Sequence, residues 1–129
     1  MKYTRGFTVI ELLIVVVLLT AASMLFFVQK NNVEVAARDE TRKTSINAMY
    51  YSLEEIYFKK NNTYPRVIST EVLPAVDPDL FKDPSGVKIG EADSDFSYEG
   101  NNCDGNTCKA YTLRTTLQNE DDYIKTNRN

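Results

Sequence analysis

The hydrophobic pattern divides the chain into three stretches. An apolar run, residues 7–28, contains one ionisable side chain, Glu11. As an α-helix it would be about 33 Å long at ~1.5 Å per residue, enough to cross the hydrocarbon core of a bilayer. Residues 29–60 carry apolar positions at helical spacing, and the residues that follow alternate as strands do. We therefore predict one long helix followed by a small domain of mixed structure.

The long helix is predicted to run without a break from Phe7 to Lys60, because no Pro or Gly occurs between them. At about 81 Å it is too long to be buried in so small a domain, so its first half must be covered by a membrane or by copies of itself. The mixed-charge residues 38–43 are expected to form a solvated face. The apolar stripe of the second half consists of Ile46, Met49, Tyr50, Leu53, Ile56 and Tyr57.

Turn signals and alternation outline the C-terminal domain. The polar residues 61–63 before Tyr64-Pro65 predict the end of the helix. An antiparallel hairpin is expected over residues 96–117, with a third strand possible around residues 87–89. A sheet packed on the apolar stripe gives an α+β fold. The polar tail after Leu117 is expected to be frayed or loosely docked.

The two cysteines, Cys103 and Cys108, flank an Asp-Gly turn signal within the predicted hairpin. They would face each other near the turn, at a separation that a disulfide can bridge. Two sulfurs without His or further Cys cannot complete a zinc site, and the spacing is not that of a C-x-x-C motif. For an exported chain we favour a structural disulfide over a metal pair or a redox motif.

The composition of the chain argues against several classes of function. The formal net charge is −3, and −5 without Lys2 and Arg5, which argues against direct DNA binding and against nucleic-acid binding in general. The chain has no His and no Trp, and it lacks a phosphate-binding loop, a G-x-S-x-G and an H-E-x-x-H motif. We expect no enzymatic activity and no cofactor. Calcium is disfavoured because the aspartates do not have EF-hand spacing and resemble turn formers; they are Asp77, Asp79, Asp83, Asp93 and Asp95.

Residues 1–13 also resemble a known signal. A short basic leader ends at Gly6, an aromatic Phe7 follows, and Glu11 is the fifth residue after Gly6. This pattern closely resembles the class III signal peptide of type IV pilins and pseudopilins. Tyr57-Phe-Lys-Lys-Asn-Asn-Thr-Tyr-Pro65 and the Asp-Pro-x-Gly form at 83–86 resemble the same family less specifically. An ordinary secretory signal has a shorter apolar core without an acid in it.

The resemblance implies how the chain is processed and organised. A prepilin peptidase would cleave between Gly6 and Phe7 and methylate the Phe7 amine. The expected segments are a leader (1–6), a transmembrane and filament-core helix (7–28), its amphipathic continuation (29–60) and a globular head (61–129). Family members often have a Gly and a Pro in the apolar helix, where this chain has Thr20 and Val28. We therefore expect a more continuous helix here.

Glu11 suggests how copies would assemble. A carboxylate inside a membrane helix costs about 2.5–3.5 kcal/mol and needs a partner. Cleavage after Gly6 would create such a partner, the Phe7 amine, on the same chain and on every neighbouring copy.

Three functions remain open at this stage. The first is a type IV pilus subunit, held as a single-pass protein in the cytoplasmic membrane, contacting lipid and the pilus assembly machinery, and then polymerised into a homopolymeric cell-surface filament. Such filaments serve motility, adhesion or DNA uptake. The second is a pseudopilin of a type II secretion system. The third, from another class, is a membrane-anchored binding protein that does not polymerise.

Overall fold

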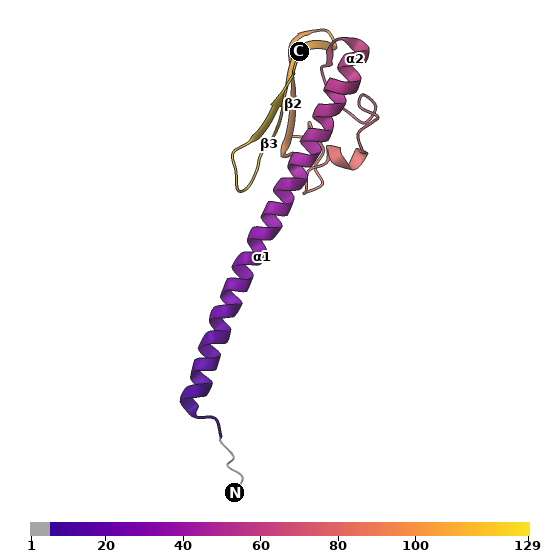
Figure 1. Ribbon diagram of the computed structural model, residues 1–129. Coiled ribbons are helices and arrows are strands. Elements are labelled where there is room, and N and C mark those ends of the chain that lie inside the picture. The colour runs from indigo at the N-terminus through magenta and orange to yellow at the C-terminus, as the bar shows by residue number, and fades with distance from the viewer. Residues whose placement is uncertain (1–5) are drawn as a thin grey trace. The chain divides into compact units, whose positions relative to one another are not determined.

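The computed structural model describes residues 6–129 (Figure 1), so most of the predicted leader lies outside the described residues. The chain divides into two compact units, one that ends at Val35 and a second from Ala36 to Asn129. Helix α1 (Val9–Tyr51) is followed directly by the π-helix η1 (Ser52–Tyr57) and by α2 (Phe58–Asn61). The predicted unbroken helix is confirmed from Val9, two residues after its expected start at Phe7, and it continues through Thr20 and Val28.

The helix ends where the polar turn was predicted. Asn62 adopts the left-handed conformation, with φ of 56°, and its backbone N–H donates to the Phe58 carbonyl at 2.7 Å. Asparagine tolerates this conformation better than most residues, and a left-handed residue after the last turn is a common helix terminator. Strand β1 (Tyr64–Pro65) follows at once.

The π-helix changes which residues face the core. Ser52, Leu53 and Glu54 are all buried, although three successive residues of a straight α-helix would span about 200°. The predicted core positions Ile46, Met49 and Leu53 are fully buried, which confirms that part of the stripe. Ile56, predicted on the same stripe, is instead 51% exposed, because the wider turn rotates the residues that follow it.

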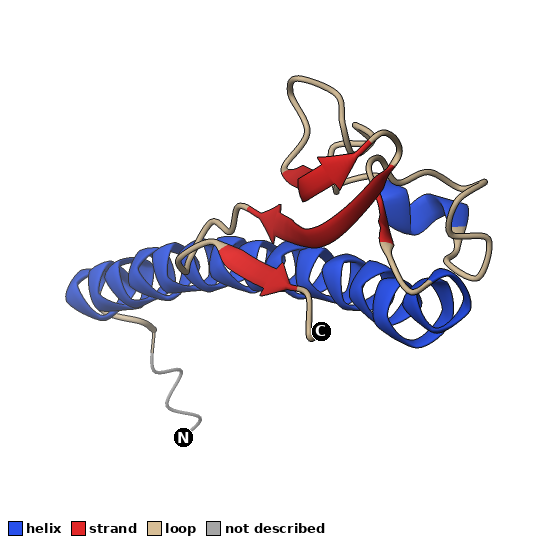
Figure 2. Ribbon diagram, turned by 90° about the horizontal axis from the view of Figure 1, so that it is seen from above, coloured by secondary structure: helices blue, strands red, loops and turns tan. Residues whose placement is uncertain are grey.

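The second unit pairs the helix with a four-stranded antiparallel sheet, which confirms the α+β fold (Figure 2). Strands β2 (Phe96–Asp104) and β3 (Thr107–Thr115) form the predicted hairpin. On its other side β3 pairs with β1 near the hairpin turn and with β4 (Tyr123–Thr126) at its far end. Figure 2 shows the sheet alongside the helix. Their shared core includes Ile46, Met49, Leu53, Tyr64, Phe96, Tyr111 and Leu113.

The possible third strand around residues 87–89 is wrong. The segment contributes only an isolated bridge between Lys82 and Lys88, after the short 3₁₀ helix η2 (Pro78–Phe81). Gly86 and Gly90 both have φ near 90°, a conformation that ends an extended strand on either side of the bridge. The third and fourth strands are β1 and β4 instead.

The tail after Leu117, expected to be frayed or loosely docked, is not frayed: it contains β4 and docks along the helix. Tyr123 Oη donates to Asn47 Oδ1 at 3.0 Å, and the Lys43 ammonium contacts the Glu120 carboxylate at 2.8 Å. The Lys125 ammonium lies 5.2 Å from the centre of the Tyr50 ring. These contacts are polar or cation–π and join residues distant in sequence. The hydrophobic pattern of the tail therefore does not predict that it docks.

The mixed-charge stretch is not a uniformly solvated face. Asp39 and Arg42 are buried, and the Arg42 guanidinium contacts both Asp39 (2.9 Å) and Asp95 (2.8 Å). The Asp39 carboxylate also accepts hydrogen bonds from the backbone N–H groups of Gln118 and Asn119. This network fixes the loop before β4 to the helix, and the other charges of the stretch remain at or near the surface.

This network predicts a dependence on acid. Burial by itself raises the pKa of Asp39. Hydrogen bonds from the backbone N–H groups of Gln118 and Asn119, together with the charge of Arg42, lower it by more, so the pKa of Asp39 lies below its ordinary value. The ionised Asp39 carboxylate therefore stabilises the folded protein fully above about pH 4, the pKa of Asp in an unfolded chain. This stabilisation is lost as the pH falls through the lower pKa of Asp39 in the folded protein. We expect Asp39→Asn to destabilise the protein near pH 7 and to flatten its acid dependence.

The measurement is thermal unfolding of the full chain in detergent between pH 2 and 7. Asp77→Asn is the matched control, because Asp77 is exposed and only caps η2. An unchanged acid dependence in Asp39→Asn would count against the assignment.

Candidate functional site

The first described residues lead directly into the helix. Gly6, Phe7 and Thr8 precede α1, and the Phe7 side chain is 80% exposed. Thr8 caps the helix: its carbonyl accepts from the Leu12 N–H and its hydroxyl from the Glu11 N–H, at 3.2 and 3.4 Å. Thr8 and Glu11 have the T-x-x-E spacing of a capping box, and an acid in the first turn also favours the helix dipole. The sequence prediction missed this cap, although the spacing could have revealed it.

The apolar run is exposed around its whole circumference. The large side chains from Val9 to Val28 are between 47 and 80% exposed, and the helix is long and apolar enough to cross a membrane. A helix that is hydrophobic on all sides must be covered by lipid or by other protein. The Thr20 and Ser23 hydroxyls bond to the carbonyls of Val17 and Leu19, so the helix itself satisfies them.

Glu11 differs from these two polar residues. Within residues 6–129 its carboxylate has neither a hydrogen bond nor an ion pair. The carboxylate lies one turn into an apolar helix. Once lipid or protein covers that helix, an unpaired carboxylate is costly and needs a cation as partner. The geometry brings Gly6, Phe7 and Glu11 together at the same end of the helix.

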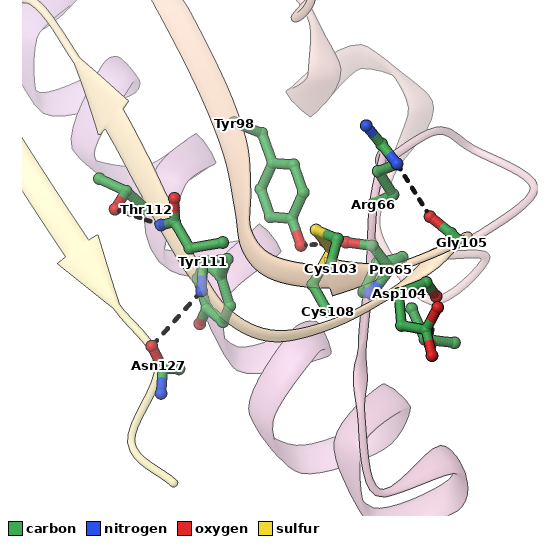
Figure 3. The surroundings of a disulfide bond; sticks show 12 residues. Pro65, Arg66, Tyr98, Cys103, Asp104, Gly105, Cys108, Tyr111, Thr112 and Asn127 are labelled. Carbon is green, nitrogen blue, oxygen red and sulfur yellow. Dashed lines mark hydrogen bonds between the residues drawn. A yellow bond between two sulfur atoms is a disulfide. The ribbon is translucent and has the colours of Figure 1, made fainter.

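The second feature is the end of the head closed by the disulfide (Figure 3). Cys103 and Cys108 are bonded, as predicted, and face each other across the hairpin with their Cα atoms 3.9 Å apart. Gly105 follows Asp104 with φ of 63°, a conformation that suits the first position of a tight hairpin turn. Arg66 donates to the Gly105 carbonyl at 3.0 Å, and Tyr98 Oη donates to the Pro65 carbonyl at 2.6 Å.

Gly100 makes room for the disulfide. A Cβ placed there would lie 2.6 Å from the Cys108 sulfur and 3.1 Å from the Cys103 sulfur. The bridge thus packs directly on the backbone of β2, where a glycine in the interior of a strand marks a close approach. In the sequence, the signal for this close approach is a Gly inside a predicted strand, although Gly100 was not among the predicted site residues.

We expect Gly100→Ala to destabilise the head by about 1–3 kcal/mol, the usual cost of overpacking. The measurement is the shift in the free energy of unfolding of the full chain in detergent. The clash involves the bridge, so the same substitution should cost less in a background in which both cysteines are Ser. Equal costs in the two backgrounds would contradict this explanation.

A buried carboxylate, Glu54, joins the helix to the sheet and to the C-terminal residues near the disulfide. Tyr111 Oη donates to it at 2.8 Å and Tyr64 Oη at 3.1 Å, while the Arg128 N–H donates at 3.1 Å. Burial, with Glu54 as a second cause, raises the pKa of Tyr111, so its hydroxyl stays protonated and remains a donor. Glu54 therefore links η1, the sheet and the C-terminal residues.

Three of the aspartates that suggested calcium, Asp77, Asp83 and Asp95, have partners within the protein. Asp77 accepts from the Asp79 N–H, and Asp83 accepts from the N–H groups of Ser85 and Val87, as turn formers do. Asp95 is an ion-pair partner of Arg42. Among residues 6–129 no three His, Cys, Asp or Glu side chains form a group that could hold a metal ion.

Residues 1–27 match the family model of the prokaryotic N-terminal methylation motif. This motif is the class III signal peptide of type IV pilins and pseudopilins, so the predicted resemblance is confirmed for this part of the chain. Comparison with curated proteins and with solved structures gave no significant match. The motif supports a type IV pilin or a pseudopilin, a class of structural proteins, and implies processing by a prepilin peptidase and membrane anchoring.

Proposed function

We propose that the chain is a structural subunit of a type IV pilus, cleaved between Gly6 and Phe7 and polymerised through residues 7–28 into a surface filament. The observation that carries this proposal is the apolar helix, exposed on all sides, whose carboxylate has no partner within the described residues. A lipid bilayer can cover the aliphatic side chains, but it offers the Glu11 carboxylate no cation in its hydrocarbon core. A neighbouring copy supplies both the apolar cover and, after cleavage, the Phe7 amine.

Gly6 supports processing at this point. Its φ does not lie in the left-handed region, and a Cβ added there would meet nothing among the described residues. The local fold therefore does not require a glycine at this position, whereas a peptidase that binds the extended chain at the cleavage point does benefit from a small residue.

We expect the mature chain to begin at Phe7 with a methylated amine. The measurement is the intact mass of the subunit from sheared surface material, and retention of Met1 in filaments would overturn the assignment. Gly6→Val should leave the head folded but cause the uncleaved chain to accumulate in the membrane. Electron microscopy of the same material tests for filaments directly.

The second candidate is a pseudopilin, which the N-terminal motif accommodates equally well. The hairpin closed by the Cys103–Cys108 disulfide favours the pilin, since a cross-linked loop resists proteases and shear on an exposed filament. Filaments on cells at native expression support the pilin. Their absence, combined with loss of protein secretion on deletion of the gene, would favour the pseudopilin. A correctly cleaved subunit that stays monomeric would indicate an anchored binding protein.

A further inference from the structure

A cavity of about 380 Å³ opens on the head between the segment after β1 and the loop around η2. Its apolar lining includes Ile68, Phe81 and Ile89, of which Ile68 and Phe81 are buried in the core. This volume falls within the range of small-molecule sites in proteins, which combine an apolar lining with a few polar groups. Neither the N-terminal helix nor the disulfide takes part in it.

Two lysines face each other at this cavity. Lys82 and Lys88 are partners in an antiparallel bridge, and both line the cavity. The flanking hydrogen bonds, from the Ile89 N–H to the Phe81 carbonyl and from the Asp83 N–H to the Val87 carbonyl, make them a non-hydrogen-bonded pair. Side chains are closest in such pairs, and like charges directly opposite each other are destabilising. An unfavourable pair at the edge of a cavity suggests a ligand that carries negative charge.

Of the two lysines, Lys82 has an acidic ion-pair partner among the described residues and Lys88 does not. Asp79 contacts Lys82 at 3.6 Å, and within the described residues Lys88 has no ion pair. The hydroxyl-bearing residues Ser69 and Thr70 line the same cavity. The Ser69 hydroxyl accepts from the Val72 N–H and retains its own proton to donate.

We propose that this cavity binds an acidic sugar unit, with its carboxylate between Lys82 and Lys88. Its ring hydroxyls would bond to Ser69 and Thr70, and its apolar ring face would pack on Ile89. Charge, hydroxyls and aliphatic surface within one cavity of this size fit a carboxylated monosaccharide better than a bare anion, which would leave the apolar lining without a partner. The site would give a filament subunit a contact with acidic polysaccharide, independently of how the subunits assemble.

The test is titration of the ¹⁵N-labelled full chain in non-ionic detergent with glucuronate, glucose, acetate and inorganic phosphate. We expect glucuronate to shift the amide signals of residues 68–70 and 88–89 with a Kd on the order of 1 mM, and the other probes to bind at least tenfold more weakly. Equal binding of acetate or phosphate would overturn the sugar assignment, and no shift at these residues with glucuronate would overturn the site.

Lys82→Gln and Lys88→Gln should each weaken glucuronate binding about 5–10-fold, since a charge-assisted hydrogen bond is lost. Lys109→Gln, on β3 and outside the cavity lining, is the matched control and should bind as the wild type does. Relief of like-charge repulsion should also raise the Tm of Lys88→Gln slightly, on the order of 1–4 °C. A variant that is at least as stable but binds weakly separates ligand recognition from folding, and undiminished binding in both variants would refute the proposal.

Discussion

Replacing Glu11 with Ala should abolish filaments or reduce them severely, while the protein remains stable and inserted in the membrane. Loss of the carboxylate makes residues 7–28 a better membrane helix, so the unassembled subunit gains stability. In the proposed filament core the same change leaves the Phe7 amine of a neighbouring copy without its counter-charge. Removing one partner of a buried ion pair costs about 3–5 kcal/mol, and polymerisation repeats this cost at every subunit.

The measurement is the number of filaments per cell in a strain that lacks the wild-type protein, with subunit levels checked by immunoblot. Glu34→Ala is a matched control, because Glu34 is an exposed acid of the same helix beyond the apolar run. It should leave filament number unchanged. If Glu11→Ala cells were normally piliated, Glu11 would be no more than a capping residue, a role that its spacing from Thr8 already offers.

The parts of the fold that could be predicted from the sequence depend on local order. The helix follows from the absence of Pro and Gly, its end from Asn62 and Pro65, and the hairpin from alternation around Asp104-Gly105. The disulfide follows from the hairpin register, because Cys103 and Cys108 are direct cross-strand partners. In each case the residues that decide the structure are neighbours in the chain.

The parts that were missed depend on partners far away in sequence. Asp39 looked like an ordinary surface acid, and its burial depends on backbone N–H groups at 118 and 119. The docked tail has little apolar character, so only its polar and cation–π contacts with the helix reveal that it is ordered. A periodic pattern records which face is apolar, but it does not identify a polar residue whose partners are supplied elsewhere.

The π-helix involves both an apolar residue of the local helical pattern and a polar residue whose partners are distant in sequence. Its wider turn allows Leu53 to reach the apolar core and the adjacent Glu54 to reach the tyrosines and the C-terminal backbone. An α-helical period extrapolated through residues 52–57 therefore assigns Ile56 to the core and gives Glu54 no special role. π-helices occur often at functional sites, and here the wider turn places a charged residue inside the head.

Glu54 should accordingly be the costliest single polar substitution in the second unit, Ala36 to Asn129. Glu54→Ala leaves the Tyr64 and Tyr111 hydroxyls and the Arg128 N–H without their acceptor in a buried site. Each stranded donor costs about 1–3 kcal/mol. Allowing for partial relaxation, we expect the free energy of unfolding to fall by about 3–5 kcal/mol, with the C-terminal segment released first.

The adjacent acid provides a matched control. Glu55 also contacts Arg128, but its side chain is exposed, and Glu55→Ala should cost no more than about 1 kcal/mol. Urea unfolding of the full chain in detergent measures both, and hydrogen exchange at residues 123–128 reports release of the segment. Tyr111→Phe should cost less in the Glu54→Ala background than in the wild type, because its hydroxyl has already lost its acceptor there. Similar costs for Glu54→Ala and Glu55→Ala would show that the buried carboxylate does not hold the head together.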